Sequence, residues 1–316
     1  MRTQVILSAD DRFSAQLGTT IFSLLINTKN PENIHITILD GGLKTKNKEK
    51  LYELVAFFKT TLEFSDNPKD LYKNFSTSKK ELSTATFYRI SIPDIISEKV
   101  KKAVYIDCDL IFESDIAELF EYNLTDKQAV GAIEDISRTP AYELLGIPKT
   151  KYFNAGVLLI NLEHWRKNNI SSDVQSFLLE KDGLLTSNDQ CALNAILWNK
   201  WRRLPLQWNA QSGIYKRRLY TSPNFGYSKK EFLQAIYNPK IIHYVGTRKP
   251  WTANCPHPLK SRYYYYNQQT SWSEPSTSKL ETIRIALESK KIHHFIHGYI
   301  LKEKIALYKR IKKLSR

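Results

Sequence analysis

This 316-residue chain contains little cysteine and no long apolar run. Its three cysteines, Cys108, Cys191 and Cys255, form no C-x-x-C pair, so we expect no disulfide framework and a reducing compartment. No apolar stretch approaches the roughly 18 residues that a helix needs to cross a bilayer. The polar segment Asp10–Arg12 interrupts the first apolar stretch, which argues against a signal peptide. We therefore expect a cytoplasmic protein.

Two common phosphate-binding motifs are also missing. No G-x-G-x-x-G follows the first apolar stretch, and no G-x-x-x-x-G-K-[ST] occurs anywhere in the chain. Dinucleotide-binding and P-loop interpretations therefore lose their main sequence support.

Acidic residues are outnumbered, with 32 Asp and Glu against 47 Lys and Arg and a net charge of +15. This excess favours acidic partners such as nucleic acid, anionic lipid or phosphorylated substrates. More than half of it lies in residues 261–316, where 12 Lys and Arg accompany four Asp and Glu. A nucleic-acid-binding protein would instead carry basic residues across one face of its core domain, so we expect no nucleic-acid partner.

Strand-like and helix-like segments alternate along the first two-thirds of the chain. Hydrophobic residues make up 42% of the sequence, which is enough for a packed core. Residues 5–9, 34–39 and 61–64 suit strands, and 13–27 and 47–58 have apolar residues at helical spacing. This alternation predicts an α/β fold with a mostly parallel sheet covered by helices. Such sheets bind ligands at the carboxyl ends of their strands.

A short acidic box follows the apolar run Ala103–Ile106. Asp107 and Asp109 are two residues apart, and in an extended chain such residues point the same way, so we expect the two carboxylates to converge. Two uncompensated carboxylates beside apolar residues are unstable. A hard divalent cation such as Mg²⁺ or Mn²⁺ is the simplest partner that stabilises them. The box therefore predicts a metal site that serves a diphosphate.

Three basic or imidazole side chains have both a structural and a functional interpretation. His243, in the apolar segment 241–245, is either a core histidine or a third metal ligand through a neutral ring nitrogen. Lys249 is either ordinary loop charge or a diphosphate contact. Arg89 is either a surface charge or a substrate clamp.

Several acidic and amide side chains have the same two interpretations. Asp10 and Asp11 cap the next helix, contact a nucleoside, or divide these two roles between them. Asn154 either shapes a turn or reads a sugar hydroxyl. Asp189 and Gln190 either stabilise the start of a helix or point into the site.

The C-terminal stretch 292–314 has apolar residues near helical spacing and a lysine-rich end. Such a helix either packs on the main domain or lies on an anionic lipid surface. Because residues 261–278 are rich in tyrosine and serine and lack periodicity, we expect one domain over 1–260 and a helical, basic extension over 261–316.

Six stretches, in this order, resemble the family 8 glycosyltransferases, which include bacterial galactosyl- and glucosyltransferases and glycogenins. The resemblance covers roughly residues 1–255, and the F-N-A-G-V-L-L-I-N-L and H-x-x-G-x-x-K-P-W stretches are its most specific parts. The matching stretches are Ser8–Asp11, Thr86–Arg89, Tyr105–Asp109, Phe153–Leu162, Asn188–Gln190 and His243–Trp251.

The resemblance implies a GT-A fold, in which a Rossmann-like nucleotide half continues into an acceptor half. It implies a UDP-hexose donor and Mn²⁺ (or Mg²⁺) as the cofactor, with Asp107, Asp109 and His243 as the metal ligands. The positions that match the family's nucleotide-sugar contacts are Ala9, Asp10, Asp11, Phe13, Arg89, Asp107, Cys108, Asp109, Asp135, Asn154, Ala155, Asp189, Gln190, His243, Gly246 and Lys249. Among them, Cys108 replaces the more usual middle residue of the box and would act through its backbone.

The implied activity is retaining, metal-dependent transfer of galactose or glucose from a UDP-sugar to a glycan on a bacterial surface polysaccharide, lipopolysaccharide or glycoprotein. The candidate catalytic residues are Gln190, Asp189 and Asn154. A front-face route is preferred over double displacement, because no carboxylate is an unambiguous nucleophile. Competing interpretations are a metal-dependent sugar-nucleotide hydrolase, a basic nucleic-acid-binding protein and an inactive sugar-binding protein. We expect a cytoplasmic enzyme whose tail either packs on the main domain or contacts the inner face of the membrane.

Overall fold

The computed structural model describes residues 2–65, 72, 75, 83–136, 141–181, 185, 188–215, 225–252 and 254–273. It contains two compact units, Met1–Gly246 and Thr247–Arg316. The helix expected at 292–314 lies outside the described residues, and the domain boundary expected after residue 260 stays a prediction. None of the helices in the described part is long and apolar enough to cross a membrane.

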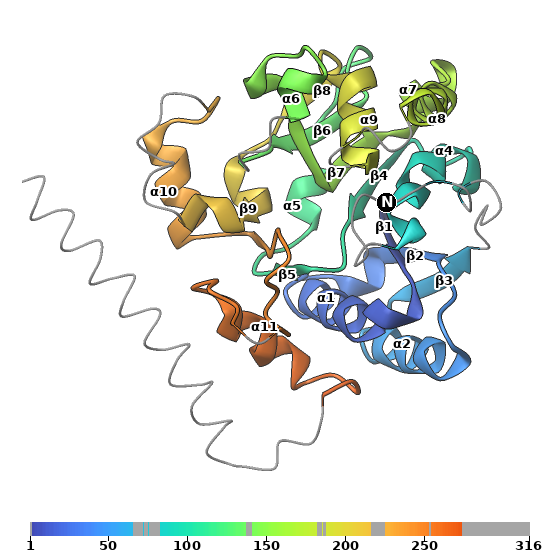
Figure 1. Ribbon diagram of the computed structural model, residues 1–316. Helices are drawn as coiled ribbons and strands as arrows, with labels where there is room; N and C mark the ends of the chain where they lie inside the picture. Colours follow the sequence, from blue (N-terminus) through green and yellow to red (C-terminus); the bar gives the residue numbers. More distant parts are fainter. Residues whose placement is uncertain are drawn as a thin grey trace, which may run out of the picture. The chain divides into compact units, whose positions relative to one another are not determined.

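The first unit is built on a seven-stranded sheet with the order β3-β2-β1-β4-β7-β6-β8 (Figure 1). Strands β1 to β4, β6 and β8 run parallel to one another, and β7 is antiparallel to both of its neighbours, β4 and β6. The mostly parallel sheet predicted from the sequence is therefore confirmed. The strands are β1 Thr3–Ala9, β2 Ile34–Asp40, β3 Thr61–Ser65, β4 Lys102–Ile106, β6 Val130–Glu134, β7 Phe153–Asn161 and β8 Trp201–Arg203.

A second, three-stranded sheet has the order β5-β10-β9. Its strands are β5 Leu110–Phe112, β9 Ala210–Gln211 and β10 Ile241–His243. Strand β10 pairs antiparallel with β5 and parallel with β9. The alternation of the sequence did not predict this sheet, because its strands have only two or three residues and come from distant parts of the chain.

Helices cover both faces of the main sheet, as Figure 1 shows for the blue N-terminal helices and the green to yellow central ones. Helix α1 contacts β1 and α2 contacts β3, whereas α7 contacts β4 and α9 contacts β7. The α-helices are α1 Ser14–Ile26, α2 Thr45–Phe57, α4 Ile92–Ile95, α5 Ala117–Phe120, α6 Ala141–Leu144, α7 Leu162–Lys167, α8 Ile170–Glu180, α9 Asn188–Leu197 and α10 Lys229–Tyr237, with α11 Lys260–Asn267 in the second unit. Short 3₁₀ helices connect them at η1 Asp11–Phe13, η2 Pro31–Asn33, η3 Thr84–Ser91, η4 Lys149–Lys151, η5 Leu206–Asn209 and η6 Ser212–Tyr215.

The core follows from the alternation of side chains along the strands. Ile6 of β1, Tyr105 of β4 and Leu158 of β7 belong to one buried cluster with Trp165 of α7 and Leu193 of α9. Neighbouring residues of the same strands point to the opposite face, because successive side chains of a strand alternate. Parallel strands buried on both faces explain the nearly continuous apolar runs in the sequence.

Candidate active site

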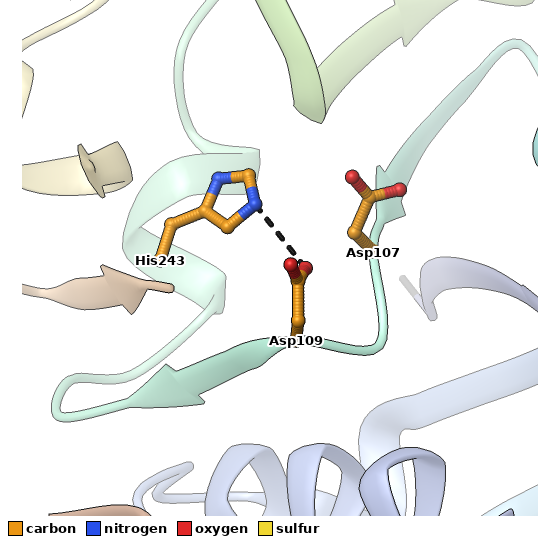
Figure 2. Close-up of side chains that lie close together, drawn as sticks. All are labelled: Asp107, Asp109 and His243. Carbon is orange, nitrogen blue, oxygen red and sulfur yellow. Dashed lines mark ion pairs between the residues drawn. The ribbon is translucent and has the colours of Figure 1, made fainter. Parts of the chain in front are cut away.

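Three side chains predicted from the sequence to be metal ligands lie close together at the ends of short strands. Asp107 follows β4, Asp109 precedes β5, and His243 is the last residue of β10. Their ligand atoms lie within 4.8 Å of one another, and His243 Nε2 is 3.2 Å from Asp109 Oδ1. Figure 2 shows the three side chains directed toward a common point. His243 is buried, but its ring faces carboxylates, which favours the ligand interpretation over that of an ordinary core histidine.

The two carboxylates converge for a different reason from the one expected. The Asp107 N–H donates to the Gly156 carbonyl of β7 at 2.9 Å, in the main sheet. The Asp109 carbonyl accepts from the Tyr244 N–H at 3.1 Å, directly after β10 of the small sheet. The expectation of a single extended strand is therefore wrong. The chain bends between two sheets, and this bend brings the carboxylates together.

Helix α1 and strand β1 hold the residue in the middle of this bend. The Thr20 hydroxyl of α1 lies 2.8 Å from the Cys108 carbonyl oxygen and 2.9 Å from that of Leu110. The Cys108 thiol donates to the Ser8 carbonyl at 3.2 Å. Burial, reinforced by the neighbouring carboxylates, raises the pKa of this thiol well above its ordinary value. Cys108 is therefore a neutral structural residue, and its thiol does not belong to the ligand set.

Arg89 of η3 lies between two carboxylates and is 5% exposed, so the surface-charge interpretation is wrong. Its Nη2 is 2.9 Å from Asp107 Oδ1, its Nε is 2.9 Å from Asp189 Oδ2, and its Nη1 donates to the Ala155 carbonyl at 2.6 Å. Burial disfavours the charged guanidinium, but Asp107 and Asp189 outweigh burial and raise the pKa of Arg89. The premise that both carboxylates of the acidic box lack compensation is therefore wrong for Asp107.

Asp189, near the start of α9, is buried and fully engaged. The Thr86 hydroxyl donates to its Oδ1 at 2.8 Å, and Arg89 pairs with its Oδ2. Burial raises the pKa of Asp189 despite the nearby Arg89 cation. Both oxygens of this carboxylate are therefore committed to protein partners.

A polar network around Gln190 joins α9 to β7. Gln190 Oε1 accepts from the Ala155 N–H at 3.1 Å and from Asn154 Nδ2 at 3.2 Å. Its Nε2 donates to Asp135 Oδ2 at 2.6 Å and to the Tyr152 hydroxyl at 3.2 Å. The structure thus brings together four residues predicted to contact the donor sugar, and the turn interpretation of Asn154 is wrong because Asn154 lies in β7.

The two aspartates after β1 have clear structural roles. Asp10 caps η1 by accepting from the Arg12 N–H at 2.9 Å and pairs with the Arg12 guanidinium at 2.8 Å. Asp11 instead accepts from the Lys44 N–H at 2.9 Å and from Asn47 Nδ2 at 2.7 Å, at the start of α2. The Lys44 hydrogen bond lowers the pKa of Asp11. Capping is confirmed for Asp10, and the nucleoside contacts of both residues stay predictions.

The remaining predicted contacts lie at several places in the chain. Ala9 is the buried last residue of β1, and Phe13 ends η1. Gly246 has a φ of +104° and ends the first unit. Lys249 belongs to the second unit, so its diphosphate contact stays a prediction.

Sequence reasoning missed a buried residue that contacts a predicted metal ligand and a predicted sugar contact. Asn209, at the end of η5, is fully buried, accepts a hydrogen bond from His243 Nδ1 at 2.9 Å and donates to Asn154 Oδ1 at 2.8 Å. A single amide between apolar neighbours, Trp208 and Ala210, was the available signal. It gave no indication of partners that lie 34 and 55 residues away.

The side chains of the cluster fit a hard or borderline divalent cation. Two carboxylates and one imidazole nitrogen form an oxygen-rich donor set of the kind that suits Mn²⁺ or Mg²⁺, whereas a thiolate would favour softer metals. The engagement of Cys108 by Ser8 keeps its sulfur out of this set.

Comparison with known proteins assigns the chain to a family. The model of glycosyl transferase family 8 matches residues 4–255, which is most of the chain. The chain belongs to glycosyl transferase family 8. It is therefore a glycosyltransferase, and the resemblance found in the sequence is confirmed.

Curated relatives of this family 8 glycosyltransferase come from several bacteria. General stress protein A of Bacillus subtilis is 34% identical over 273 residues, which cover 85% of this chain and 94% of that protein. The lipopolysaccharide 1,3-galactosyltransferase of Salmonella typhimurium is 26% identical over 278 residues, covering 84% of this chain and 77% of that protein. The match therefore extends over most of each protein.

A solved structure confirms the fold of the family 8 chain. The crystal structure of the galactosyltransferase LgtC, in complex with donor and acceptor sugar analogues, superposes with a TM-score of 0.75 at 22% identity. The match covers 87% of this chain and 98% of LgtC. The GT-A fold predicted from the sequence is thereby confirmed.

Proposed function

We propose that this glycosyltransferase is a retaining, metal-dependent hexosyltransferase. It transfers galactose or glucose from a UDP-sugar to a glycan acceptor on a bacterial surface polysaccharide, lipopolysaccharide or glycoprotein. The observation that carries the proposal is the convergence of Asp107, Asp109 and His243 at the ends of β4, β5 and β10. The Salmonella relative and LgtC are both named galactosyltransferases, which supports a hexose as the transferred group.

In this proposal Asp107, Asp109 and His243 hold the divalent cation. When bound there, Mn²⁺ or Mg²⁺ would offset the negative charge that develops on the departing UDP. Arg89 keeps Asp107 in place through its 2.9 Å ion pair and contacts the donor sugar. Lys249 and Gly246 contact the diphosphate, and Asp10 and Asp11 contact the uridine.

The sugar subsite is formed by Asn154 and Ala155 of β7 with Asp189 and Gln190 of α9, and by Asp135. Preorganised polar groups stabilise developing charge most strongly when they do not have to reorient during the reaction. Gln190 meets this condition because its amide is held at both ends. Its carbonyl oxygen accepts two hydrogen bonds, and its amide nitrogen donates two. We assign Gln190 to stabilise the cationic sugar, with Asn154 reading a sugar hydroxyl.

Front-face transfer is the proposed route. A double displacement through Asp189 would require a carboxylate that reaches the sugar, but Asp189 is only 5% exposed, and Thr86 and Arg89 each hold one of its oxygens. The departing phosphate oxygen would take the proton of the acceptor hydroxyl on the same face of the sugar. A covalent glycosyl-enzyme trapped on Asp189, in the wild type or in a Gln190→Glu variant, would contradict this route.

The test is a UDP-release assay with Mn²⁺ and UDP-Gal, UDP-Glc, UDP-GlcNAc or UDP-GalNAc as donors. We expect turnover with UDP-Gal or UDP-Glc, and a loss of about 100-fold or more in Asp107→Asn and Asp109→Asn, since charge stabilisation of this kind contributes factors of this size. Asp173→Asn, an exposed position of α8, is the matched control and is expected to retain full activity.

Two outcomes would contradict the proposal. No binding and no turnover with any UDP-sugar would refute the donor assignment. Rapid sugar release without an acceptor would instead favour a sugar-nucleotide hydrolase, the alternative that uses the same carboxylates.

A further inference from the structure

A chain of hydrogen bonds links the backbone of β7 to the ring of His243, and the backbone groups at its start fix which atoms donate and which accept. It begins at two backbone N–H groups, which can only donate. The Gly156 N–H donates to Asn154 Oδ1 at 3.1 Å, and the Ala155 N–H donates to Gln190 Oε1 at 3.1 Å. Asn154 Nδ2 then donates to Gln190 Oε1 at 3.2 Å. The two contacts of the Asn154 amide, with the Gly156 N–H and with Gln190 Oε1, therefore agree that its carbonyl oxygen faces Gly156 and its nitrogen faces Gln190.

This orientation determines that of Asn209. The Asn154 Oδ1 atom is an acceptor, so the Asn209 atom 2.8 Å away has to be the amide nitrogen. The Asn209 carbonyl oxygen therefore faces His243 Nδ1 at 2.9 Å. An amide oxygen only accepts, and the ring nitrogen opposite it has to carry a proton.

The proton on Nδ1 determines the state of the other ring nitrogen, Nε2. A neutral imidazole carries one proton, so with Nδ1 protonated its Nε2 has a free lone pair. That Nε2 is the nitrogen that faces Asp109 at 3.2 Å. A divalent cation coordinated by both Nε2 and the Asp109 carboxylate would stabilise these two electron-rich atoms.

We propose that Asn209 is a positioning residue that holds His243 in the Nδ1-protonated tautomer and thereby presents Nε2 to a divalent cation. The same amide ties Asn154 of the sugar subsite to the metal site. This inference rests on the proposed function, because it requires that Asp107, Asp109 and His243 bind a cation. Asn209 and its two partners are buried, with exposures of 0% for Asn209, 3% for His243 and 5% for Asn154, so water does not replace these contacts easily.

The test measures Mn²⁺ affinity in the full-length protein without any sugar nucleotide, from the electron paramagnetic resonance signal of free Mn²⁺. Asn209→Ala removes the acceptor for Nδ1 and is expected to weaken Mn²⁺ binding about 10- to 100-fold, the usual effect of losing a residue that orients a metal-bound histidine. Asn209→Asp keeps an acceptor for Nδ1 but has no proton to donate to Asn154. We expect the Mn²⁺ affinity of this variant to lie within a few-fold of that of the wild type. Its turnover of the UDP-sugar is expected to be impaired, because the hydrogen bond to Asn154 is lost.

Asn194→Ala is the matched control. Asn194 is also fully buried, and its amide contacts the Phe153 N–H, the Phe153 carbonyl and the Gln190 carbonyl. Removing it loosens α9 against β7 but touches no metal ligand, so we expect unchanged Mn²⁺ affinity. Thermal unfolding of each variant reports its folded fraction.

The outcomes separate this inference from the proposed function. Wild-type affinity in folded Asn209→Ala, a loss of tenfold or more in Asn209→Asp, or an equal loss in Asn194→Ala would each overturn the role of Asn209 and leave the metal site standing. A wild-type protein that does not bind Mn²⁺ would overturn the metal site and the inference together.

Discussion

Gly156 shows how much the candidate site depends on the absence of a single side chain. A Cβ at this position would lie 2.4 Å from His243 Cε1 and 2.8 Å from Asp107 Oδ2. Neither partner can move away easily, because His243 is hydrogen-bonded to Asn209 and Asp107 forms an ion pair with Arg89. Glycine is therefore required here for close approach rather than for backbone freedom.

We predict that Gly156→Ala displaces His243 and Asp107 and lowers transfer activity by about 100-fold, since misplacement of reacting groups by about 1 Å has effects of this size. Steady-state UDP release and Mn²⁺ titration would measure the loss. The control is Gly131→Ala in β6, where the added Cβ would meet the side chains of Leu204 and Leu124 at 3.1 and 3.3 Å. Wild-type activity in Gly156→Ala would show that the site tolerates the extra methyl group.

The junctions between strands and helices organise the edge of the sheet where the site lies. Asp40 ends β2 and accepts from the Gly42 N–H at 2.8 Å and the Leu43 N–H at 2.7 Å, and Lys48 Nζ of α2 is 2.6 Å from its Oδ2. Burial alone would raise the pKa of Asp40, but Lys48 and the two N–H groups outweigh burial and lower it. The ionised carboxylate therefore stabilises the step from β2 to α2.

We predict that Asp40→Asn lowers the free energy of unfolding by about 1 kcal/mol at pH 7, because the amide keeps the hydrogen bonds but loses the ion pair. The pKa of Asp40 is lower in the folded state than the ordinary value of about 3.9, so the unfolded chain binds the proton first as the pH falls. The stabilisation is therefore complete above about pH 5 and is lost as the pH falls through the folded pKa.

Urea unfolding of the wild type and Asp40→Asn between pH 7 and pH 3 would measure this trend. A difference in unfolding free energy that stays constant with pH would show that packing, and not charge, is responsible.

At the scale of the whole molecule, the uneven charge is the property that the GT-A fold does not explain. Residues 292–316 carry seven Lys and Arg and one Glu. Each basic residue near an anionic membrane contributes about 1 kcal/mol of attraction. The peripheral contact with the inner face of the membrane and the cytoplasmic location both stay predictions.

We predict that deletion of residues 292–316 reduces binding to phosphatidylserine-containing vesicles at least about tenfold at physiological salt, because most of this attraction is lost. Vesicle sedimentation of the full chain and of residues 1–291 would compare them, with uncharged vesicles as the control. UDP release from the shortened protein should be unchanged. Equal sedimentation of both proteins would contradict a role of the tail in membrane contact.

Much of the candidate site was predictable because local patterns carry it. The apolar run before Asp107 and the apolar segment around His243 indicated strand ends, and strand ends are where α/β sheets bind ligands. The structure confirms that Asp107, Asp109 and His243 come together. The expected geometry failed at the bend, because a two-residue spacing says nothing about whether the strand continues.

Other features were outside the reach of local patterns because they join distant segments. Arg89 pairs with Asp189, and Asn209 joins His243 to Asn154 across 34 and 55 residues. The sequence could suggest two roles for Arg89, but only its burial between carboxylates decided which applies.

The sequence by itself determined the α/β class, the mostly parallel sheet, the family and the residue types of the site, because periodicity and motif spacing are local properties. Only the tertiary structure decided that β7 runs antiparallel, that β5, β9 and β10 form a second sheet, and that Asp107 has a cationic partner. It also decided the orientation of the Asn154, Asn209 and His243 side chains. Hydrogen-bond direction depends on which groups meet in space, and the chain brings these groups together only when it folds.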